Sequence, residues 1–450
     1  GRAIPRAAAS PEAPKARAER RAASACSVSA TQPRQARGAG VPQAEPEPLL
    51  VIDREAEAAR RLWFLESLKK APTFDRAEDP RAFHGRLFRM PDDSEPAEPK
   101  VTWKSDKKPR QNSPDWLTAS EYADVPQVFQ AKVAMLAVLL TASRHTLAYT
   151  GAGLSVAAGI GMAAVGSSAQ GGMGVATAGE PTLAHCMLAE LNRQNLLHGW
   201  VQQNHDGLPQ KAGYRQEDIN EIHGSWFDPS NPVVKYSGSL RGDLFDDMEM
   251  QADSSDLVLV LGTSLTGLNA DQCVTKTAER SRHGSALGSV IISPQRTAQD
   301  GRAVLRIFAK ADDVMAALAA ELRLGPGALG RRQGVLRSAD LYSKQMKALV
   351  PYDANGVRSQ TVKTCWDLSK GAKVRIGANS NIRGARQPQD KDITSSTVGT
   401  VTGRDDKTCS VVINIGSVNK RLGLWWLETA MRGGVTALPV VNVDAQEIKA

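Results

Sequence analysis

The chain has 450 residues, 41% of them hydrophobic, and a formal net charge of +8 from 56 Lys and Arg against 48 Asp and Glu. Two or three domains fit this length. The modest charge excess permits an acidic partner but leaves nucleic-acid binding undecided, because such binding needs the positive charge clustered on one surface. The longest apolar run, Val133 to Leu140, is far shorter than the roughly 20 residues of a membrane-spanning helix, so we expect no membrane span.

The five cysteines are widely separated in the sequence, and no CxxC pair occurs. They are Cys26, Cys186, Cys273, Cys365 and Cys409. Their spacing indicates neither a zinc knuckle nor a redox dithiol. An odd, scattered set fits a reducing compartment, so we expect an intracellular protein of the nucleus or cytoplasm, with the mitochondrion as an alternative.

The N-terminal part differs in composition from the rest. Residues 1–48 are rich in Ala, Arg, Pro and Ser and contain few large apolar side chains, which predicts a disordered basic arm. The same composition is found in organelle targeting segments, which we keep as the alternative. Residues 49–112 combine helical spacing from Ile52 to Lys70 with a charged linker.

Residues 113–325 have the pattern of an α/β domain. Val133, Leu136, Ala137 and Leu140 recur at helical spacing. Strands are expected at 145–150, 200–202, 256–261 and 289–293, and further helices at 182–191 and 312–324. Nearly continuous Val and Leu in the third of these strands is typical of a strand that is buried on both faces. Alternating strands and helices predict a doubly wound, Rossmann-like parallel sheet.

The C-terminal part is expected to form a second, smaller domain. After a linker at 326–365, the four segments "AKVRI", "STVGTVTG", "CSVVINI" and "LWWLE" predict short strands within 366–432. We interpret this region as a small SH3-like β-barrel that serves as an interaction module. Trp425 and Trp426 on adjacent strand positions would point to opposite faces, one into the core and one outward. Residues 433–450 are expected to be a tail.

Three of the predicted strands end in polar turns that expose the backbone. These turns are Thr150 to Ser155, Gln203 to Gly207, and Gly262 to Ser264. In an open parallel sheet the carboxyl ends of the strands line one ligand crevice. Glycine lets backbone N–H groups approach phosphate oxygens, and a following helix N-terminus adds a favourable dipole. The sequence therefore predicts a nucleotide site. A dehydrogenase fits poorly, because no Asp or Glu follows between Gly151 and Ala178 to hold the ribose.

The same residues resemble a known family. "YTGAGLSVAAGI", "EPTLAHCMLAELNRQNLLHGWVQQNHDGLPQKAG", "EIHGS", "LVLVLGTSL" and "VIISPQRT" occur in the order and spacing of the sirtuins, over roughly residues 113–325. Sirtuins are NAD-dependent protein lysine deacylases, so the resemblance implies NAD as cofactor and an acylated lysine of a protein, with histones among the candidates, as substrate. The products would be nicotinamide and O-acyl-ADP-ribose. Related ADP-ribosyl transfer would use the same crevice.

The resemblance also implies roles for single residues. His223 matches the family's general base, and Asn204 and Asp206 match the turn at the nicotinamide end, so these three form the predicted catalytic set. The implied cofactor-binding residues are Gly151, Ala152, Gly153, Ser155, Gln203, Asn204, Asp206, Gly262, Thr263, Ser264 and Ser293. His185 and His205 are expected to be structural.

Three segments depart from the family pattern. Gly161-Met162-Ala163-Ala164 replaces a polar and aromatic loop, and the zinc module's region contains no cysteine, with Ser237-Gly238-Ser239 in place of Cys-Gly-Gly. We therefore predict no zinc, no other metal site and a reduced small lobe. The substrate loop reads Leu244-Phe245-Asp246-Asp247. The alternative function is a catalytically inactive NAD- or ADP-ribose-binding scaffold, with a protein partner bound through the C-terminal barrel.

Overall fold

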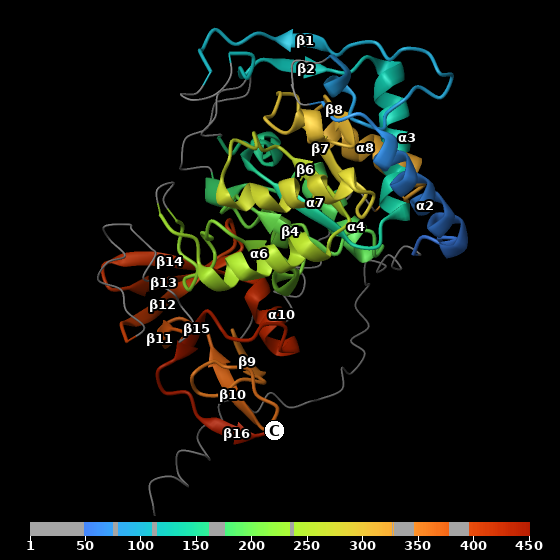
Figure 1. The fold of residues 1–450 in the computed structure, drawn as a ribbon. Helices are drawn as coiled ribbons and strands as arrows, with labels where there is room; N and C mark the ends of the chain where they lie inside the picture. Colours follow the sequence, from blue (N-terminus) through green and yellow to red (C-terminus); the bar gives the residue numbers. More distant parts are fainter. Residues whose placement is uncertain are drawn as a thin grey trace, which may run out of the picture.

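A six-stranded parallel sheet organises the larger part of the molecule (Figure 1). The computed structural model describes residues 49–74, 80–109, 115–161, 176–234, 238–325, 327, 346–377 and 396–450. The sheet strands are β3 (Thr146–Thr150), β4 (Gly199–Gln202), β5 (Ile219–Glu221), β6 (Leu257–Leu261), β7 (Gly288–Ile292) and β8 (Leu305–Ile307). Their spatial order β5-β4-β3-β6-β7-β8 is the doubly wound Rossmann order. The predicted α/β fold class is confirmed.

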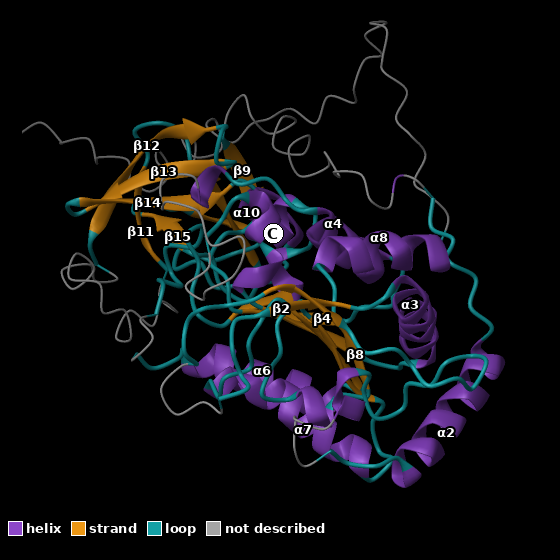
Figure 2. Cartoon of the chain, turned by 90° about the horizontal axis from the view of Figure 1, so that it is seen from above, coloured by secondary structure: helices purple, strands orange, loops and turns teal. Residues whose placement is uncertain are grey.

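Helices cover both faces of this sheet (Figure 2). The helices α3 (Pro126–Ala142), α4 (Leu183–Arg193) and α8 (Ala311–Glu321) pack on one face, and α6 (Gly242–Ser254) and α7 (Gln272–Arg282) pack on the other. Leu257, Leu259 and Leu261 of β6 enter the first of these two cores, while Val258 and Val260 enter the second. Successive side chains of a strand point to opposite faces, so the apolar run in β6 is explained by burial on both sides.

Residues preceding position 113 belong to the same core. The helix α2 (Arg54–Lys70) begins after Asp53, whose carboxylate accepts hydrogen bonds from two first-turn N–H groups. Its Phe64 and Leu68 are buried against α3 and the sheet. We expected a helical segment and charged linker outside the α/β domain, but α2 and Phe88 complete its core. A short antiparallel pair joins β1 (Lys100–Trp103) of this region to β2 (Glu121–Ala123), which follows position 113.

The C-terminal module contains two antiparallel sheets. One has the order β14-β13-β12-β11-β15 and the other β16-β10-β9. The strands are β9 (Lys347–Val350), β10 (Val362–Asp367), β11 (Lys373–Ile376), β12 (Val398–Asp405), β13 (Ser410–Ile415), β14 (Val418–Gly423), β15 (Val440–Asn442) and β16 (Glu447–Lys449). Because β14 and β15 end the five-stranded sheet without pairing with each other, the expected closed SH3-like barrel is not confirmed.

Several expectations about this module need correction. The segment predicted as a strand around Trp425 is a helix, α10 (Trp425–Arg432). Trp425, Trp426, Leu427 and Ala430 of this helix all belong to the module's core, so both tryptophans are buried at 5% exposure, where we expected one to be exposed. The supposed linker contributes β9 and β10, and the supposed tail contributes β15 and β16. The arm at 1–48 lies outside the described residues. No described helix is long and apolar enough to cross a bilayer.

A buried histidine makes the fold sensitive to acid. His84 is 5% exposed, and burial, helped by nearby Lys132, lowers its pKa from 6.5 to about 3. The folded state therefore keeps this ring neutral while the unfolded chain binds a proton below pH 6.5. The resulting stability is complete above pH 6.5 and is lost as pH falls toward 3, with a loss of about 2 kcal/mol at pH 5.

Comparing His84→Phe with the unsubstituted protein isolates this contribution, because Phe keeps the ring contact with Phe88 and does not titrate. Urea unfolding at pH 7.5 and pH 5.0 is the measurement. We expect the stability difference between the two proteins to shift by about 2 kcal/mol in favour of the variant at the lower pH. An unchanged difference at the two pH values would show that His84 is not held neutral.

Candidate functional site

The three polar turns meet at the carboxyl ends of neighbouring strands. The chain leaves β3 at Gly151, whose N–H donates to the carbonyl of Leu261 at the end of β6 at 3.0 Å. On the other side, the N–H of Gln203 donates to the carbonyl of Thr150 at 2.9 Å. β3 lies between β4 and β6 and is the strand at which the sheet order reverses. The predicted turns therefore surround the topological switch point, where α/β proteins bind ligands.

Glycine is required where two of these turns touch. The N–H of Gly153 donates to the carbonyl of Gly262 at 2.8 Å. A Cβ at Gly262 would lie 2.3 Å from the backbone nitrogen of Leu154, and its φ of +63° is one that side-chain-bearing residues rarely adopt. A Cβ at Gly153 would lie 2.7 Å from the Cα of Gly262. The two loops are therefore packed backbone against backbone.

A buried polar cluster supports the Gly-rich loop from beneath. The hydroxyl of Ser155 donates to Asp206 Oδ2 at 2.6 Å, and Asp206 Oδ1 accepts from the N–H of Leu208 at 3.1 Å. Asn204 Nδ2 donates to the carbonyl of Gly151 and to Ser155 Oγ, both at 3.0 Å. These bonds join the turn after β4 to the turn after β3.

Accessibility divides the predicted site residues into two groups. Half-buried positions, which a ligand can reach, are Ala152, Gly153, Gln203, Asn204, His223, Gly262, Thr263 and Ser264. Buried positions are Gly151, Ser155, Asp206 and Ser293. Ser155 and Asp206 bind each other rather than facing the crevice, so in this structure they hold the loop in place. Ser293 Oγ likewise accepts from the N–H of Gln295 at 3.1 Å.

His223 lies in the turn that follows β5, next to the Gln203 turn. Burial first and then nearby His205 lower its pKa from 6.5 to about 4, while the Gln203 backbone acts in the opposite direction. The ring is therefore neutral at pH 7 and able to accept a proton. The Nδ1 of His205 lies 2.8 Å from the carbonyl of Gly224 and its backbone carbonyl accepts from Trp226, which fits the structural role expected for it.

Sequence reasoning missed the residues that anchor the third turn. Tyr149 of β3 donates its hydroxyl to Asp271 Oδ1 at 2.8 Å, and Asp271 Oδ2 accepts from the N–H groups of Gly267 and Leu268. These bonds fix the loop that carries Thr263. Leu265 in this loop has φ of +49° and is buried, a backbone strain of the kind that tertiary contacts must hold. Tyr149 and Asp271 are 122 residues apart, so no pattern of neighbouring residues in the sequence predicts their contact.

Two departures from the expected pattern fall partly or wholly outside the described residues. Met162, Ala163 and Ala164 lie in the segment 162–175, and Ser237 lies in 235–237. Among the described ranges, no group of three or more His, Cys, Asp or Glu side chains is arranged to hold a metal ion. The lack of zinc stays a prediction.

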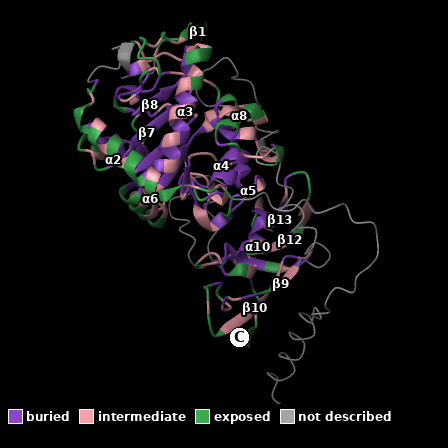
Figure 3. Ribbon diagram, turned by 90° about the vertical axis from the view of Figure 1, so that its right-hand side faces the viewer, coloured by how far each residue is buried: buried purple, intermediate pink, exposed green. Residues whose placement is uncertain are grey.

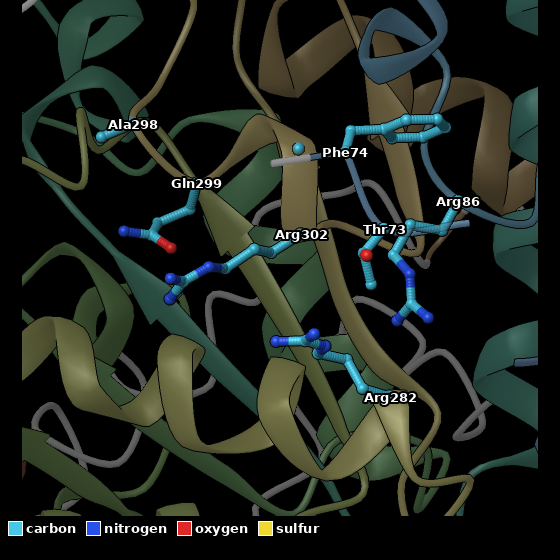
Figure 4. Close-up of a pocket in the computed structure, with 8 residues that line it drawn as sticks. Thr73, Phe74, Arg86, Arg282, Ala298, Gln299 and Arg302 are labelled. Carbon is cyan, nitrogen blue, oxygen red and sulfur yellow. The ribbon is translucent and has the colours of Figure 1, made fainter. Parts of the chain in front are cut away.

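A separate cavity of about 180 Å³ lies near the amino ends of β7 and β8, away from the predicted site (Figure 4). Its lining residues are Thr73, Phe74, Arg86, Arg282, Ala298, Gln299, Gly301 and Arg302. The Arg86 guanidinium donates to the carbonyls of Pro72 and Leu68 and to Ser281 Oγ, each at 3.1 Å. Arg86 therefore fastens the end of α2 to α7.

Comparison with known proteins gives curated relatives but no matching family model. The chain is 30% identical over 257 residues to the NAD-dependent protein deacetylase sirtuin-7 of Bos taurus, covering 45% of this chain and 63% of that protein. It is 29% identical over 267 residues to sirtuin-7 of Homo sapiens, covering 47% and 65%. It is 28% identical over 242 residues to the NAD-dependent protein deacetylase SRT1 of Oryza sativa subsp. indica, covering 44% and 49%. The chain spans less than two thirds of the length of these relatives.

Solved structures give weaker similarities. A Sir2 homologue in complex with ADP-ribose matches with a TM-score of 0.37 and 21% identity, covering 42% of this chain and 96% of that chain. A Sir2 structure with a p53 peptide and NAD+ matches with a TM-score of 0.37 and 22% identity, covering 42% and 98%. Since these scores are below 0.5, the fold assignment rests on the strand order of the sheet itself.

Strand order and the Gly-rich turn at the switch point together define an α/β protein of the dinucleotide-binding class. Five motifs of the sequence then follow one another as they do in one family, and the curated relatives carry that family's name. The chain is similar to proteins of the sirtuin family over about 45% of its length.

Proposed function

We propose that this protein is an NAD-dependent protein lysine deacylase. The observation that supports it most is the meeting of the Gly153, Asn204 and Thr263 turns at the switch point, with a neutral His223 beside them. The curated relatives are NAD-dependent protein deacetylases by name. The overall reaction would convert acyl-lysine, NAD and water into lysine, nicotinamide and O-acyl-ADP-ribose.

The residues present fit a dinucleotide. The half-buried turns offer backbone N–H groups, the Thr263 hydroxyl and the Asn204 side-chain oxygen to the polar atoms of the cofactor. When bound, NAD would supply the electrophilic C1′ of its nicotinamide ribose, which the acyl oxygen of a modified lysine attacks as nicotinamide leaves. Gly153 and Gly262 would let the backbone approach the phosphates closely, and the Gln203–Thr263 hydrogen bond of 3.1 Å would keep the two walls of the crevice in register.

His223 would take up the proton released in the reaction. A neutral ring is needed for this role, and burial keeps the ring neutral at pH 7. Asp206 would act through Ser155 and Asn204 rather than on the ligand, because its carboxylate is 1% exposed. We therefore place Asp206 as a positioning residue and keep His223 as the catalytic base.

Substrate and location remain proposals of the same kind. An acylated lysine of a protein is the substrate class, with histones among the candidates, and the nucleus or cytoplasm is the expected compartment. A partner-binding role of the C-terminal module, and any contact with nucleic acid, stay predictions from the sequence.

Nicotinamide release from NAD is the test, with an acetyl-lysine peptide pool and the same peptides unacetylated as control. Release that requires the acetylated peptides supports the deacylase. No release with either pool, together with calorimetric binding of NAD or ADP-ribose, would instead support the second candidate, an inactive nucleotide-binding scaffold. The replacement of polar residues by Met162, Ala163 and Ala164 favours that candidate.

A glycine substitution tests whether the paired turns hold NAD. Gly262→Ala would place a Cβ 2.3 Å from the Leu154 nitrogen and force the two loops apart. We expect the affinity for NAD to fall at least tenfold, about 1.4 kcal/mol. Gly159→Ala is the matched control, because Gly159 also has positive φ, +76°, but has open space at its Cβ. Calorimetry should show NAD affinity within about threefold of the original for the control. Equal affinities in both variants would contradict the assignment.

A further inference from the structure

The C-terminal helix α10 lies beside the α/β domain (Figure 3) and contacts residues 216–218, which lead into β5. The rings of Trp425 and Phe227 are 5.4 Å apart, and the N–H of Gly423 donates to the carbonyl of Phe227 at 3.0 Å. A Cβ at Gly207, in the turn after β4, would lie 2.9 Å from the Trp425 ring. The C-terminal module is therefore in direct contact with the turn that holds Asn204 and Asp206.

A line of buried hydrogen bonds leads from α10 to the end of β5. Trp425 Nε1 donates to Gln216 Oε1 at 2.8 Å, and Gln216 Nε2 donates to Glu221 Oε2 at 3.3 Å. Gln210 Nε2 also donates to Gln216 Oε1, at 3.1 Å. A tryptophan N–H has one direction in which to donate, so this contact and the Gln210 hydrogen bond together orient the Gln216 amide.

Glu221 in turn holds the backbone around His223. Its carbonyl accepts from the N–H of Gly224 at 2.9 Å and from Asn231 Nδ2 at 3.0 Å, so it closes the turn that presents His223. Its carboxyl is buried, and burial first and then Asp228 raise its pKa to about 7. Hydrogen bonds from Ser225, Gln216 and Gln210 oppose that rise. The Gln216 amide is thus one of the groups that set the pKa of the Glu221 carboxyl, and Glu221 precedes His223 by two residues.

An ion pair at the surface holds α10 on the same segment. Arg432 Nη2 lies 3.0 Å from Glu217 Oε1, and Thr429 Oγ1 donates to Glu217 Oε2 at 3.3 Å. Glu217 adjoins Gln216 in the sequence, so these contacts also hold Trp425 next to Gln216. Partly exposed pairs contribute about 1 kcal/mol or less each, which leaves the buried Trp425–Gln216 contact as the specific element.

We propose that Trp425 is a positioning residue for deacylation, acting through Gln216 and Glu221 on the turn that carries His223. The C-terminal module is then a part of the catalytic unit and not a detachable interaction domain. This inference rests on the proposed deacylase function. The sequence led us to expect a small lobe without zinc. In this proposal α10 supports that lobe.

The chain offers a matched pair of substitutions. Trp425→Phe removes the N–H that Gln216 accepts, whereas Trp426→Phe removes a neighbouring buried N–H that has no hydrogen-bond partner among the described residues. Both tryptophans are 5% exposed and both substitutions remove the same volume. We expect Trp425→Phe to lower kcat for deacylation about five- to tenfold with little change in KM for NAD, and Trp426→Phe to stay within twofold.

The pH profile separates positioning from a loss of packing. We expect the titration of Glu221 to give the rate an inflection near pH 7. Since the Gln216 hydrogen bond lowers the pKa of Glu221, loosening Gln216 should move this inflection to higher pH in Trp425→Phe and leave it in place in Trp426→Phe. Gln216→Met should reproduce the shift from the other end of the contact. Equal profiles and equal rates in the two tryptophan variants would overturn the proposal.

Amide hydrogen exchange makes the test independent of activity. In Trp425→Phe, and not in Trp426→Phe, we expect at least tenfold faster exchange in residues 219–228. If the unsubstituted protein releases no nicotinamide, the proposed function fails while this measurement still decides the coupling. Faster exchange confined to Trp425→Phe would retain the structural link, and identical exchange in the two variants would refute it.

Discussion

Replacing His223 by alanine is expected to lower acyl-lysine-dependent nicotinamide release by about 10²–10⁴, the usual contribution of a general base. The half-buried ring is neutral because burial lowers its pKa to about 4. It is therefore ready to accept a proton throughout the neutral range. The rate ratio between the original protein and the variant should be the same at pH 6 and pH 8, because both values lie well above the pKa. Steady-state assays of nicotinamide at the two pH values give this ratio.

Two controls accompany this prediction. NAD affinity measured by calorimetry should change less than about threefold, because the hydrogen bonds that join the Gly153, Asn204 and Thr263 turns to one another do not involve the imidazole. The thermal unfolding midpoint should also be retained, since the backbone carbonyl of His223 makes its hydrogen bond to Val234 in the variant too. A variant that keeps its full rate would refute the assignment of His223 as base. A rate that is lost together with NAD binding would show that the substitution disrupts the crevice.

Replacing Arg306 by methionine is expected to destabilise the α/β domain by about 3–5 kcal/mol, the cost of breaking a buried ion pair. Arg306 is fully buried, and its Nε donates to Asp300 Oδ1 at 2.8 Å. Its Nη1 donates to the carbonyls of Ser293 and Ile307 at 2.9 and 2.7 Å, and its guanidinium lies 3.6 Å from the Phe308 ring centroid. Methionine would leave the buried Asp300 carboxylate without its cation and would remove one donor each from the carbonyls of Ser293 and Ile307.

Urea unfolding of Arg306→Met and of Arg302→Met measures this effect. Arg302 is exposed, so its substitution should change stability by less than about 0.5 kcal/mol. The double substitution Arg306→Met and Asp300→Leu should recover part of the loss, because it removes both buried charges. If Arg306→Met proved as mild as Arg302→Met, the buried pair could not be what holds the segment from Ser293 to Ile307.

The sequence by itself predicted most of the α/β domain. Apolar runs predicted β6 and β7, and apolar residues spaced three and four positions apart predicted the buried face of α3. Strand and helix periods are local properties of the chain, so they can be recognised in the sequence. The three polar turns were identified for the same reason, since glycines and short polar side chains follow each strand directly. Their meeting at one edge follows from parallel strand order.

Tertiary structure decided which of these residues face the crevice. Ser155 and Asp206 were expected to touch the cofactor, yet they are 51 residues apart and bind each other in the interior. Trp425 was expected on a strand, yet it begins a helix, and the module's core buries both tryptophans. The strands β15 and β16, in the segment that we expected to be a tail, pair with β11 and β10, which lie far away in the sequence.

One physical cause separates the features that the sequence predicts from those that only the tertiary structure decides. Turns, strand faces and helix faces depend on neighbours a few residues away, so the sequence by itself determined them and, through them, the resemblance to the sirtuins. Tyr149 and Asp271, Arg306 and its carbonyls, and Trp425 and Gln216 meet only after the chain has folded, the last pair across 209 residues. Burial then fixes their hydrogen bonds, because an unpaired buried polar group costs about 1–3 kcal/mol. Only the tertiary structure decided that the C-terminal helix supports the turn of the candidate base.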